Sequence, residues 1–389
     1  MFPRAEEQLE QLLGMTAQEL DIPDHLYLEA VDEYEAVGDW LCRRYDGGGH
    51  AACEIYPQGS FRLGTVIRPV HNRDEYDLDL VCRRDLAKES ITQADLKEDV
   101  GTGLAEYQQA VAASASAPTL KEGDRCWTLV YPRDRFHMDI LPAIPDAEGA
   151  PNAILLTDRS LHFWQHSNPI DYATWFRRRM EQEFVRLREA AAKALRRDVA
   201  EVPEWQVKTT LQRAVQVLKR HRDISFQQEP KERPASIIIT TLAARAYRGE
   251  GNLYEVVAAI AARMPSLVER RNGVLWVPNP VHGKENFADR WRSHPERATR
   301  FFDWMEQVNA DLAELAGGRG FDRVIEKLAE SLGETPVRKA AERVGTAMRG
   351  ERTAGRLGMA SGTGMLSVGA TTRVRDHTYH GDPPPRRHP

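Results

Sequence analysis

Three aspartates in short hydrophobic segments form the most informative pattern in the sequence. Asp77 and Asp79 are two residues apart in a run typical of a β-strand, so both side chains project from one face of it. Neighbouring carboxylates repel each other unless a cation lies between them. Mg²⁺ is the expected cation because it prefers carboxylate oxygens and keeps phosphates in its coordination shell, and Mn²⁺ can replace it.

The third aspartate, Asp139, lies in a later segment with apolar residues at alternate positions. Those apolar residues share one face of a strand, so Asp139 points the opposite way. If this strand lies beside the strand of Asp77 and Asp79, three carboxylates converge, as two-metal phosphoryl transfer requires. We therefore predict that Asp77, Asp79 and Asp139 are metal ligands and catalytic residues.

The dipeptide Gly59-Ser60 supplies groups that can bind phosphate. It follows one expected strand and precedes a short helix expected at 61–66, so its backbone N–H groups can approach an anion closely. The Ser60 hydroxyl can donate to a phosphate oxygen, and Gln58 is a further candidate nearby. Taken singly, Asp-x-Asp is usually a solvated strand face and Gly-Ser a common turn. Their order along the chain is what favours a nucleotide site.

The composition is that of a globular protein, with 41% hydrophobic and 29% charged residues among 389. No apolar run is long enough for a membrane span, and the first residues have no signal-peptide core, so we expect a cytoplasmic protein with no membrane partner. The four cysteines lack zinc spacing and are expected to be free thiols. A net charge of −5 argues against a wholly basic surface but leaves a local basic groove open.

The expected elements change in kind along the chain. Helices are predicted up to residue 45 and at 92–113, with strands at 53–56, 76–82, 126–131 and 136–141. Helices dominate from 169 to 349, among them one long helix expected at 169–195 and another at 287–316, and a Gly-, Ser- and Arg-rich tail follows. We predict an α+β fold with a first domain at 1–165, a helical domain at 166–349 and a flexible tail at 350–389.

These motifs resemble those of the cGAS/DncV-like nucleotidyltransferases, the bacterial signal synthases of antiphage defence. The resemblance rests on the segment 57–65, which contains Gly59-Ser60, and on Tyr-Asp-Leu-Asp-Leu-Val at 76–81. It continues in the helical half at 211–223 and 234–243, and at Asn279-Pro280 and 285–288. The similar segments occur in the same order over about residues 50 to 300.

The resemblance implies a polymerase-β-like lobe with a mixed sheet, a helical second lobe and a nucleotide in the cleft between them. Lys219 and Ser236 match the family's triphosphate contacts from the helical lobe. Ser236 lies in a first helical turn, where backbone N–H groups favour phosphate. Taken without the resemblance, Lys219 is an ordinary surface lysine and Ser236 a helix cap.

The resemblance further implies that nucleoside triphosphates, ATP among them, are joined into a cyclic di- or trinucleotide with release of pyrophosphate. The segment 377–381, His-Thr-Tyr-His-Gly, looks like a tail motif that engages an accessory protein in related systems, although further residues follow it here. A nucleic-acid activator stays open. Two alternatives also stay open: transfer of nucleotides to RNA or protein, and a nucleotide sensor without catalysis.

Overall fold

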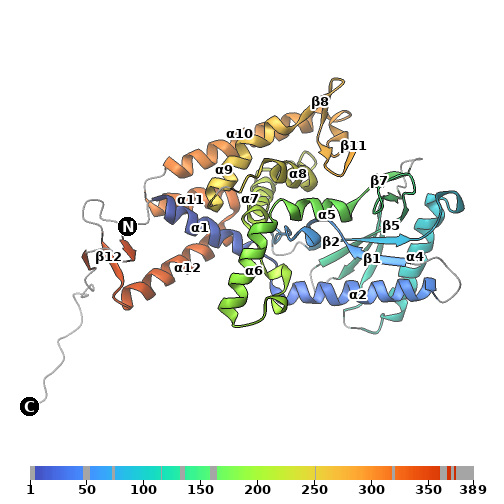
Figure 1. The fold of residues 1–389 in the computed structure, drawn as a ribbon, viewed down its shortest axis with the longest axis horizontal. Coiled ribbons are helices and arrows are strands. Elements are labelled where there is room, and N and C mark those ends of the chain that lie inside the picture. The colour runs from blue at the N-terminus through green and yellow to red at the C-terminus, as the bar shows by residue number, and fades with distance from the viewer. Residues whose placement is uncertain are drawn as a thin grey trace, which may run out of the picture.

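A sheet-based lobe and a helical lobe make up the molecule (Figure 1). The computed structural model describes residues 5–46, 53–71, 75–114, 116–131, 136–157, 164–249, 251–317, 320–359, 366–368 and 372–373. The mixture of a sheet with separate helices agrees with the predicted α+β class.

A seven-stranded mixed sheet forms the first lobe, with the order β1-β2-β5-β4-β3 and with β6 and β7 continuing from β5. Neighbours β2 and β5 run parallel, whereas β1 with β2 and β4 with β5 are antiparallel. The strands are β1 (Cys53–Pro57), β2 (Tyr76–Arg84), β3 (Thr119–Glu122), β4 (Trp127–Tyr131), β5 (Phe136–Pro145), β6 (Ile154–Leu156) and β7 (Gln165–Ser167).

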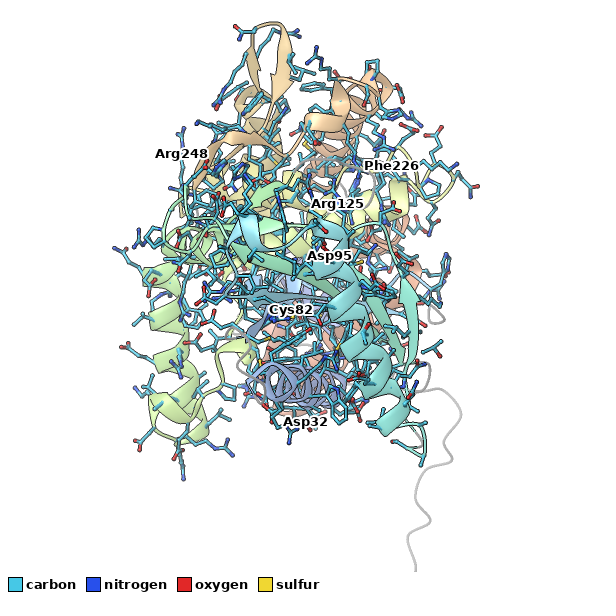
Figure 2. All side chains as sticks on the ribbon, turned by 90° about the vertical axis from the view of Figure 1, so that its right-hand side faces the viewer. Asp32, Cys82, Asp95, Arg125, Phe226 and Arg248 are labelled. Carbon is cyan, nitrogen blue, oxygen red and sulfur yellow. The ribbon has the colours of Figure 1, made fainter. Side chains whose placement is uncertain are left out.

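Two helices, α2 (Asp24–Asp46) and α4 (Gln93–Ala110), cover one face of this sheet. Leu78, Leu80 and Cys82 of β2 are buried there among apolar residues of both helices, because alternate residues of a strand share a face. When the molecule is viewed from the side of the sheet-based lobe, α2 is seen nearly end-on beneath the sheet, and Asp32 lies on the outer side of this helix (Figure 2). The opposite face of β2, which carries Asp77 and Asp79, is left for the cleft.

The second lobe is a bundle of helices around one large apolar core. Leu9, Leu12 and Leu13 of the first helix belong to this core, so that helix packs with the helical lobe and not with the sheet. The helices are α1 (Ala5–Glu19), α5 (Pro169–Arg178), α6 (Glu181–Leu195), α7 (Thr210–Ser225), α8 (Ser236–Ala246), α9 (Leu253–Arg263), α10 (Pro295–Gly317), α11 (Phe321–Leu332) and α12 (Glu334–Thr353).

Two expected helices are shorter in the structure. The single helix expected from residue 169 to 195 is interrupted at Arg179 and Met180, and the helix expected from 287 begins only at Pro295. Hairpins occupy part of the preceding region: β8 (Glu269–Arg271) with β9 (Val274–Trp276), and β10 (Pro278–Asn279) with β11 (His282–Asn286). Asn272 and Gly273 both have positive φ, the two-residue Asn-Gly turn that joins such strands.

The described part of the tail contains short strands. Antiparallel pairing joins β12 (Leu357–Met359) to both β13 (Leu366–Val368) and β14 (Thr372–Arg373). The motif at 377–381 lies outside the described residues, and the predicted domain boundaries stay predictions. Within the described ranges, none of the helices combines the length and the apolar character that crossing a membrane requires.

Candidate active site

The structure brings the three predicted acids together on neighbouring strands. The parallel register of β2 and β5 sets Asp77 opposite His137 and Asp79 opposite Asp139. Side chains alternate along both strands, so these four residues share the face that points away from the α2–α4 core. Convergence of the three acids required the strand of Asp139 to lie beside the strand of Asp77 and Asp79, and the two strands are paired.

A tight group of potential metal ligands lies within this cluster. One ligand atom from each of Asp77, His137 and Asp139 can be chosen so that all lie within 4.8 Å of one another. His137 is also close to carboxylates, with Nδ1 3.3 Å from Glu75 and Nε2 3.5 Å from Asp77. Carboxylate oxygens suit Mg²⁺ and Mn²⁺, so the donor set fits the expected ion.

The electrostatics of the acids favour a bound cation. Burial, together with the charges of Asp77 and Asp139, raises the pKa of Asp79 to about 8, against the opposing charge of Lys219. Desolvation also raises the pKa of Asp77, with Asp139 adding to the shift and His137 opposing it. Carboxylates held so close resist ionising together, and a divalent ion removes that penalty.

Asp139 is oriented by a neighbouring strand. The Thr128 hydroxyl of β4 donates to Asp139 Oδ1 at 2.6 Å, and the register places these residues opposite each other. Cys126 lies close by, and burial together with the Asp139 charge raises the pKa of its thiol to about 11, which keeps it protonated. Sequence analysis missed Thr128, although a polar residue in the middle of an apolar strand was a usable signal.

The short helix α3 (Gly59–Leu63) brings Gly59 and Ser60 to the same place. Gly59 has φ +60° and lies so close to Asp79 that a Cβ there would be 2.2 Å from Asp79 Oδ2. The backbone N–H of Gln58 donates to the carbonyl of Asp79 at 2.8 Å. The position therefore requires glycine for both its backbone conformation and its contact with the carboxylate.

Two adjoining cavities contain the predicted nucleotide-binding residues. Ser60, Asp77, Lys219 and Ser236 line a cavity of about 450 Å³. Gln58, Asp79 and again Ser236 line a larger one of about 1350 Å³ between the lobes. Because a pocket for one small ligand is usually about 300–1,000 Å³, the larger cavity has room for more than one nucleotide.

Lys219 and Ser236 approach from the helical lobe. Lys219 is 5% exposed, and its Nζ donates to the carbonyl of Thr65 at 3.0 Å. Burial, helped by the charge of Arg222, lowers the pKa of Lys219 to about 8. An ammonium has three N–H donors, so the Thr65 contact leaves capacity for a phosphate. Ser236 begins α8 and accepts a hydrogen bond from Arg222, a residue that sequence analysis missed.

A stripe of buried polar side chains on α7 binds the loop that follows α3. These side chains recur at positions three, four or seven residues apart, so they lie along one side of the helix. They donate to backbone carbonyls between residues 63 and 68: Gln212 to Leu63 at 2.9 Å, Gln216 to Val66 at 2.8 Å, Lys219 to Thr65 at 3.0 Å and Arg220 to Arg68 at 2.6 Å. Just before α7, Lys208 donates to Gly64 at 3.0 Å.

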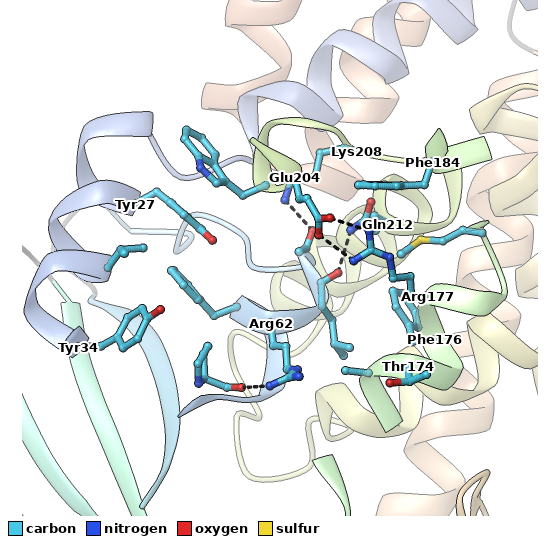
Figure 3. Close-up of a pocket in the computed structure, with 18 residues that line it drawn as sticks. Tyr27, Tyr34, Arg62, Thr174, Phe176, Arg177, Phe184, Glu204, Lys208 and Gln212 are labelled. Carbon is cyan, nitrogen blue, oxygen red and sulfur yellow. Dashed lines mark hydrogen bonds and ion pairs between the residues drawn. The ribbon is translucent and has the colours of Figure 1, made fainter. Parts of the chain in front are cut away.

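A further cavity of about 400 Å³ lies beside α3, and its lining includes Phe61 and Arg62 but not Ser60 (Figure 3). Tyr27 stacks there on Phe61 and on Trp205, each at 4.5 Å between ring centroids. Arg177, bound to Glu204 through two hydrogen bonds, closes another side. These contacts hold α3 in place and so support Ser60.

Comparison with known proteins identifies those that this chain resembles. The Second Messenger Oligonucleotide or Dinucleotide Synthetase domain (SMODS) matches residues 33–179. A c-di-GMP synthase of Roseivirga ehrenbergii is 29% identical over 386 residues, which are 97% of this chain and 98% of the relative. The cyclic dinucleotide synthase CdnG of Bradyrhizobium diazoefficiens is 29% identical over 347 residues, covering 83% of this chain and 79% of CdnG.

Solved structures share the two-lobed fold. The CdnG structure in complex with GTP superposes with a TM-score of 0.69 at 24% identity, covering 87% of this chain and 99% of that one. The GTP-bound form of Vibrio cholerae DncV gives a TM-score of 0.54 at 17% identity, covering 85% of each chain. The predicted resemblance to the cGAS/DncV-like nucleotidyltransferases is thereby confirmed: residues 33–179 match the SMODS domain, two cyclic dinucleotide synthases are similar along most of the chain, and the fold is that of CdnG and DncV.

Proposed function

We propose that this chain is a divalent-metal-dependent synthase that joins two nucleoside triphosphates into a cyclic dinucleotide and releases pyrophosphate. The observation that carries the proposal is the convergence of Asp77, Asp79 and Asp139 opposite Lys219 and Ser236 across adjoining cavities. The names of both relatives support a dinucleotide product, and GTP is the first substrate to test because one relative is a c-di-GMP synthase and the other binds GTP.

Each residue has a defined part in this proposal. Asp77, Asp79 and Asp139 would hold Mg²⁺, which when bound neutralises phosphate charge and lowers the pKa of a ribose hydroxyl. Thr128 fixes the orientation of the Asp139 carboxylate through its hydrogen bond to Oδ1. Ser60 and Ser236 donate hydroxyl hydrogens to phosphate oxygens.

Lys219 completes the phosphate site with a positive charge. Its Nζ is held by the Thr65 carbonyl, so the charge is already in position before a nucleotide binds. The proposal also includes a cytoplasmic location, which rests on the sequence, and antiviral signalling and an accessory protein at the tail, which rest on the family resemblance. None of these three is needed for the acids and the cavities to act as described.

Product analysis tests the proposal. The purified protein is incubated with GTP, with ATP and with both, in the presence of MgCl₂, and the products are treated with phosphatase and analysed by mass spectrometry. We expect pyrophosphate and a phosphatase-resistant cyclic dinucleotide, because a ring has no terminal phosphate. Label found on RNA or on protein would support the transfer alternative, and triphosphate binding without any product would support the sensor alternative.

Substitution of the acids ties the product to the site. Asp77→Asn with Asp79→Asn should abolish pyrophosphate release while the protein stays folded, since loss of like charge does not disturb packing. Asp32→Asn is a matched control, because Asp32 is an exposed acid on α2, away from the cavities. A double variant that still releases pyrophosphate at the wild-type rate would refute the proposal.

A further inference from the structure

Arg222 is a buried cation at the junction of the two cavities. Its residue exposure is 5%, and it contributes to the lining of both. On one side its Nη1 donates to Ser236 Oγ at 2.9 Å and to the carbonyl of Pro234 at 3.0 Å. Arg222 follows Lys219 by three residues on α7, so both side chains leave the same part of the helix.

The other side of the Arg222 guanidinium is held by Asp223. Nε and Nη2 donate to Asp223 Oδ1 at 2.9 and 2.6 Å, and Arg233 Nη1 lies 3.4 Å from the same oxygen. One carboxylate therefore partners two guanidinium groups, which leaves this wall of the cavities with excess positive charge. Asp77 and Asp79 of β2 also line these cavities, so a polyphosphate with its cations would lie between complementary charges.

The direction of the hydrogen bond to Ser236 is fixed by chemistry. A guanidinium has N–H donors and no acceptor, so Ser236 Oγ must accept from Arg222. The hydroxyl hydrogen takes no part in that bond and is left to donate elsewhere. Without Arg222, the hydroxyl could instead turn toward the Pro234 carbonyl, which Arg222 now occupies.

We propose that Arg222 is a positioning residue for triphosphate recognition, which holds the Ser236 hydroxyl as a hydrogen-bond donor toward the nucleotide phosphates. This inference rests on the proposed function only for the nature of the ligand, a nucleoside triphosphate. It predicts that Arg222 acts through Ser236, so the two residues should contribute to binding as one unit.

A double-mutant cycle on binding tests the inference. The dissociation constant of a non-hydrolysable GTP analogue is measured by calorimetry with MgCl₂ for the wild type, Arg222→Gln, Ser236→Ala and the double variant, with GMP as a comparison ligand. We expect Arg222→Gln to weaken analogue binding by about tenfold or more, the usual effect of losing a charged hydrogen bond. GMP binding should change little, and the double variant should bind the analogue no worse than Ser236→Ala alone, within about threefold.

Arg233→Gln is the matched control, because Arg233 shares Asp223 with Arg222, and its hydrogen bond is to Asp223 and not to Ser236. The loss of analogue binding free energy caused by Arg233→Gln should add to the loss caused by Ser236→Ala. Thermal unfolding is measured for every variant, and Arg222→Lys, which keeps the charge, replaces Arg222→Gln in the cycle if the glutamine variant does not fold. Lysine has no guanidinium fork to reach both Asp223 and Ser236, so we expect weakened analogue binding here too.

Two results would overturn the inference: additive effects of Arg222 and Ser236 substitutions, or equal losses for the triphosphate analogue and GMP. Because calorimetry with this analogue needs no turnover, the result is independent of the product. A wild type that makes no cyclic dinucleotide but shows the expected cycle would refute the proposed function and leave the role of Arg222 intact. A wild type that makes the product but shows additive effects would support the proposed function and refute the role of Arg222.

Discussion

Substitution of Gly59 by alanine tests whether the contact between α3 and Asp79 sets the geometry of the acids. The backbone of Gly59 has φ +60°, where a Cβ costs about 1–2 kcal/mol. The added Cβ would lie 2.2 Å from Asp79 Oδ2, whereas ordinary contact begins at 3.4 Å. The carboxylate must therefore move by about 1 Å, and a misplacement of that size costs on the order of 100-fold in rate.

Gly64→Ala, at the C-cap of the same helix, is a matched control. Gly64 has φ +66°, so the backbone cost is comparable, but the new Cβ would meet Gln212 Nε2 at 2.5 Å and Lys208 Nζ at 3.0 Å. Both atoms end flexible side chains, and neither belongs to an acid of the site. Urea unfolding should show that both variants lose stability by about 1–2 kcal/mol.

The assay is the initial rate of pyrophosphate release, corrected for the folded fraction. We expect Gly59→Ala to lose on the order of 100-fold and Gly64→Ala far less, because only the first displaces a carboxylate of the site. Similar rates for the two variants would refute the reasoning, since they would show that Asp79 either does not move or need not stay where it is.

The buried charges of the two lobes supply further tests. Asp79→Asn should raise the midpoint of thermal unfolding in EDTA, because asparagine avoids the cost of burying an ionisable carboxyl beside two carboxylates. MgCl₂ should raise the wild-type midpoint more than that of the variant; equal responses to MgCl₂ would contradict this. Burial lowers the pKa of Lys219 to about 8, so its charge is present below pH 8 and lost above it. Triphosphate affinity should accordingly fall above pH 8 in the wild type but not in Lys219→Arg, since arginine stays charged; calorimetry that gives parallel profiles would count against the assignment. Burial opposes the charge of Asp311, but hydrogen bonds from His221 and Lys327 outweigh it and lower its pKa to about 2. The resulting stabilisation is present above the unfolded pKa near 3.8 and is lost as pH falls toward 2. Asp311→Asn should therefore reduce the free energy of unfolding by about 1–2 kcal/mol at pH 7 and by less at pH 3, measured by urea unfolding; an undiminished difference at pH 3 would exclude this cause.

The alignment of the acids could be predicted because strand periodicity is a local property. Once 76–82 and 136–141 are assigned as strands, alternation alone decides that Asp77 and Asp79 share a face and that Asp139 lies opposite its apolar neighbours. Their position side by side in the sheet is a non-local fact, which the sequence could state only as a condition and which the register of β2 and β5 supplies.

Other features depend on tertiary contacts that no local pattern reveals. Lys219 and Arg222 were visible as cations on one helix, but the burial of Arg222 against Ser236 arises from how α7 meets α8. The buried glutamines of α7 resemble surface residues until the loop after α3 is placed beside them. The Asn272-Gly273 turn is different, because it is a local signal that sequence analysis overlooked.

The side chains of α7 that hold the loop after α3 also limit how the enzyme can move. Swinging one lobe away from the other at this seam would strip partners from the carbonyls of Leu63, Thr65 and Val66 and from the buried donors that reach them. Each donor left without a partner costs about 1–3 kcal/mol, so hinge opening at this place is unfavourable. Nucleotides must then enter, turn over and leave through an aperture of nearly constant width, which makes the release of products a natural candidate for the slow step.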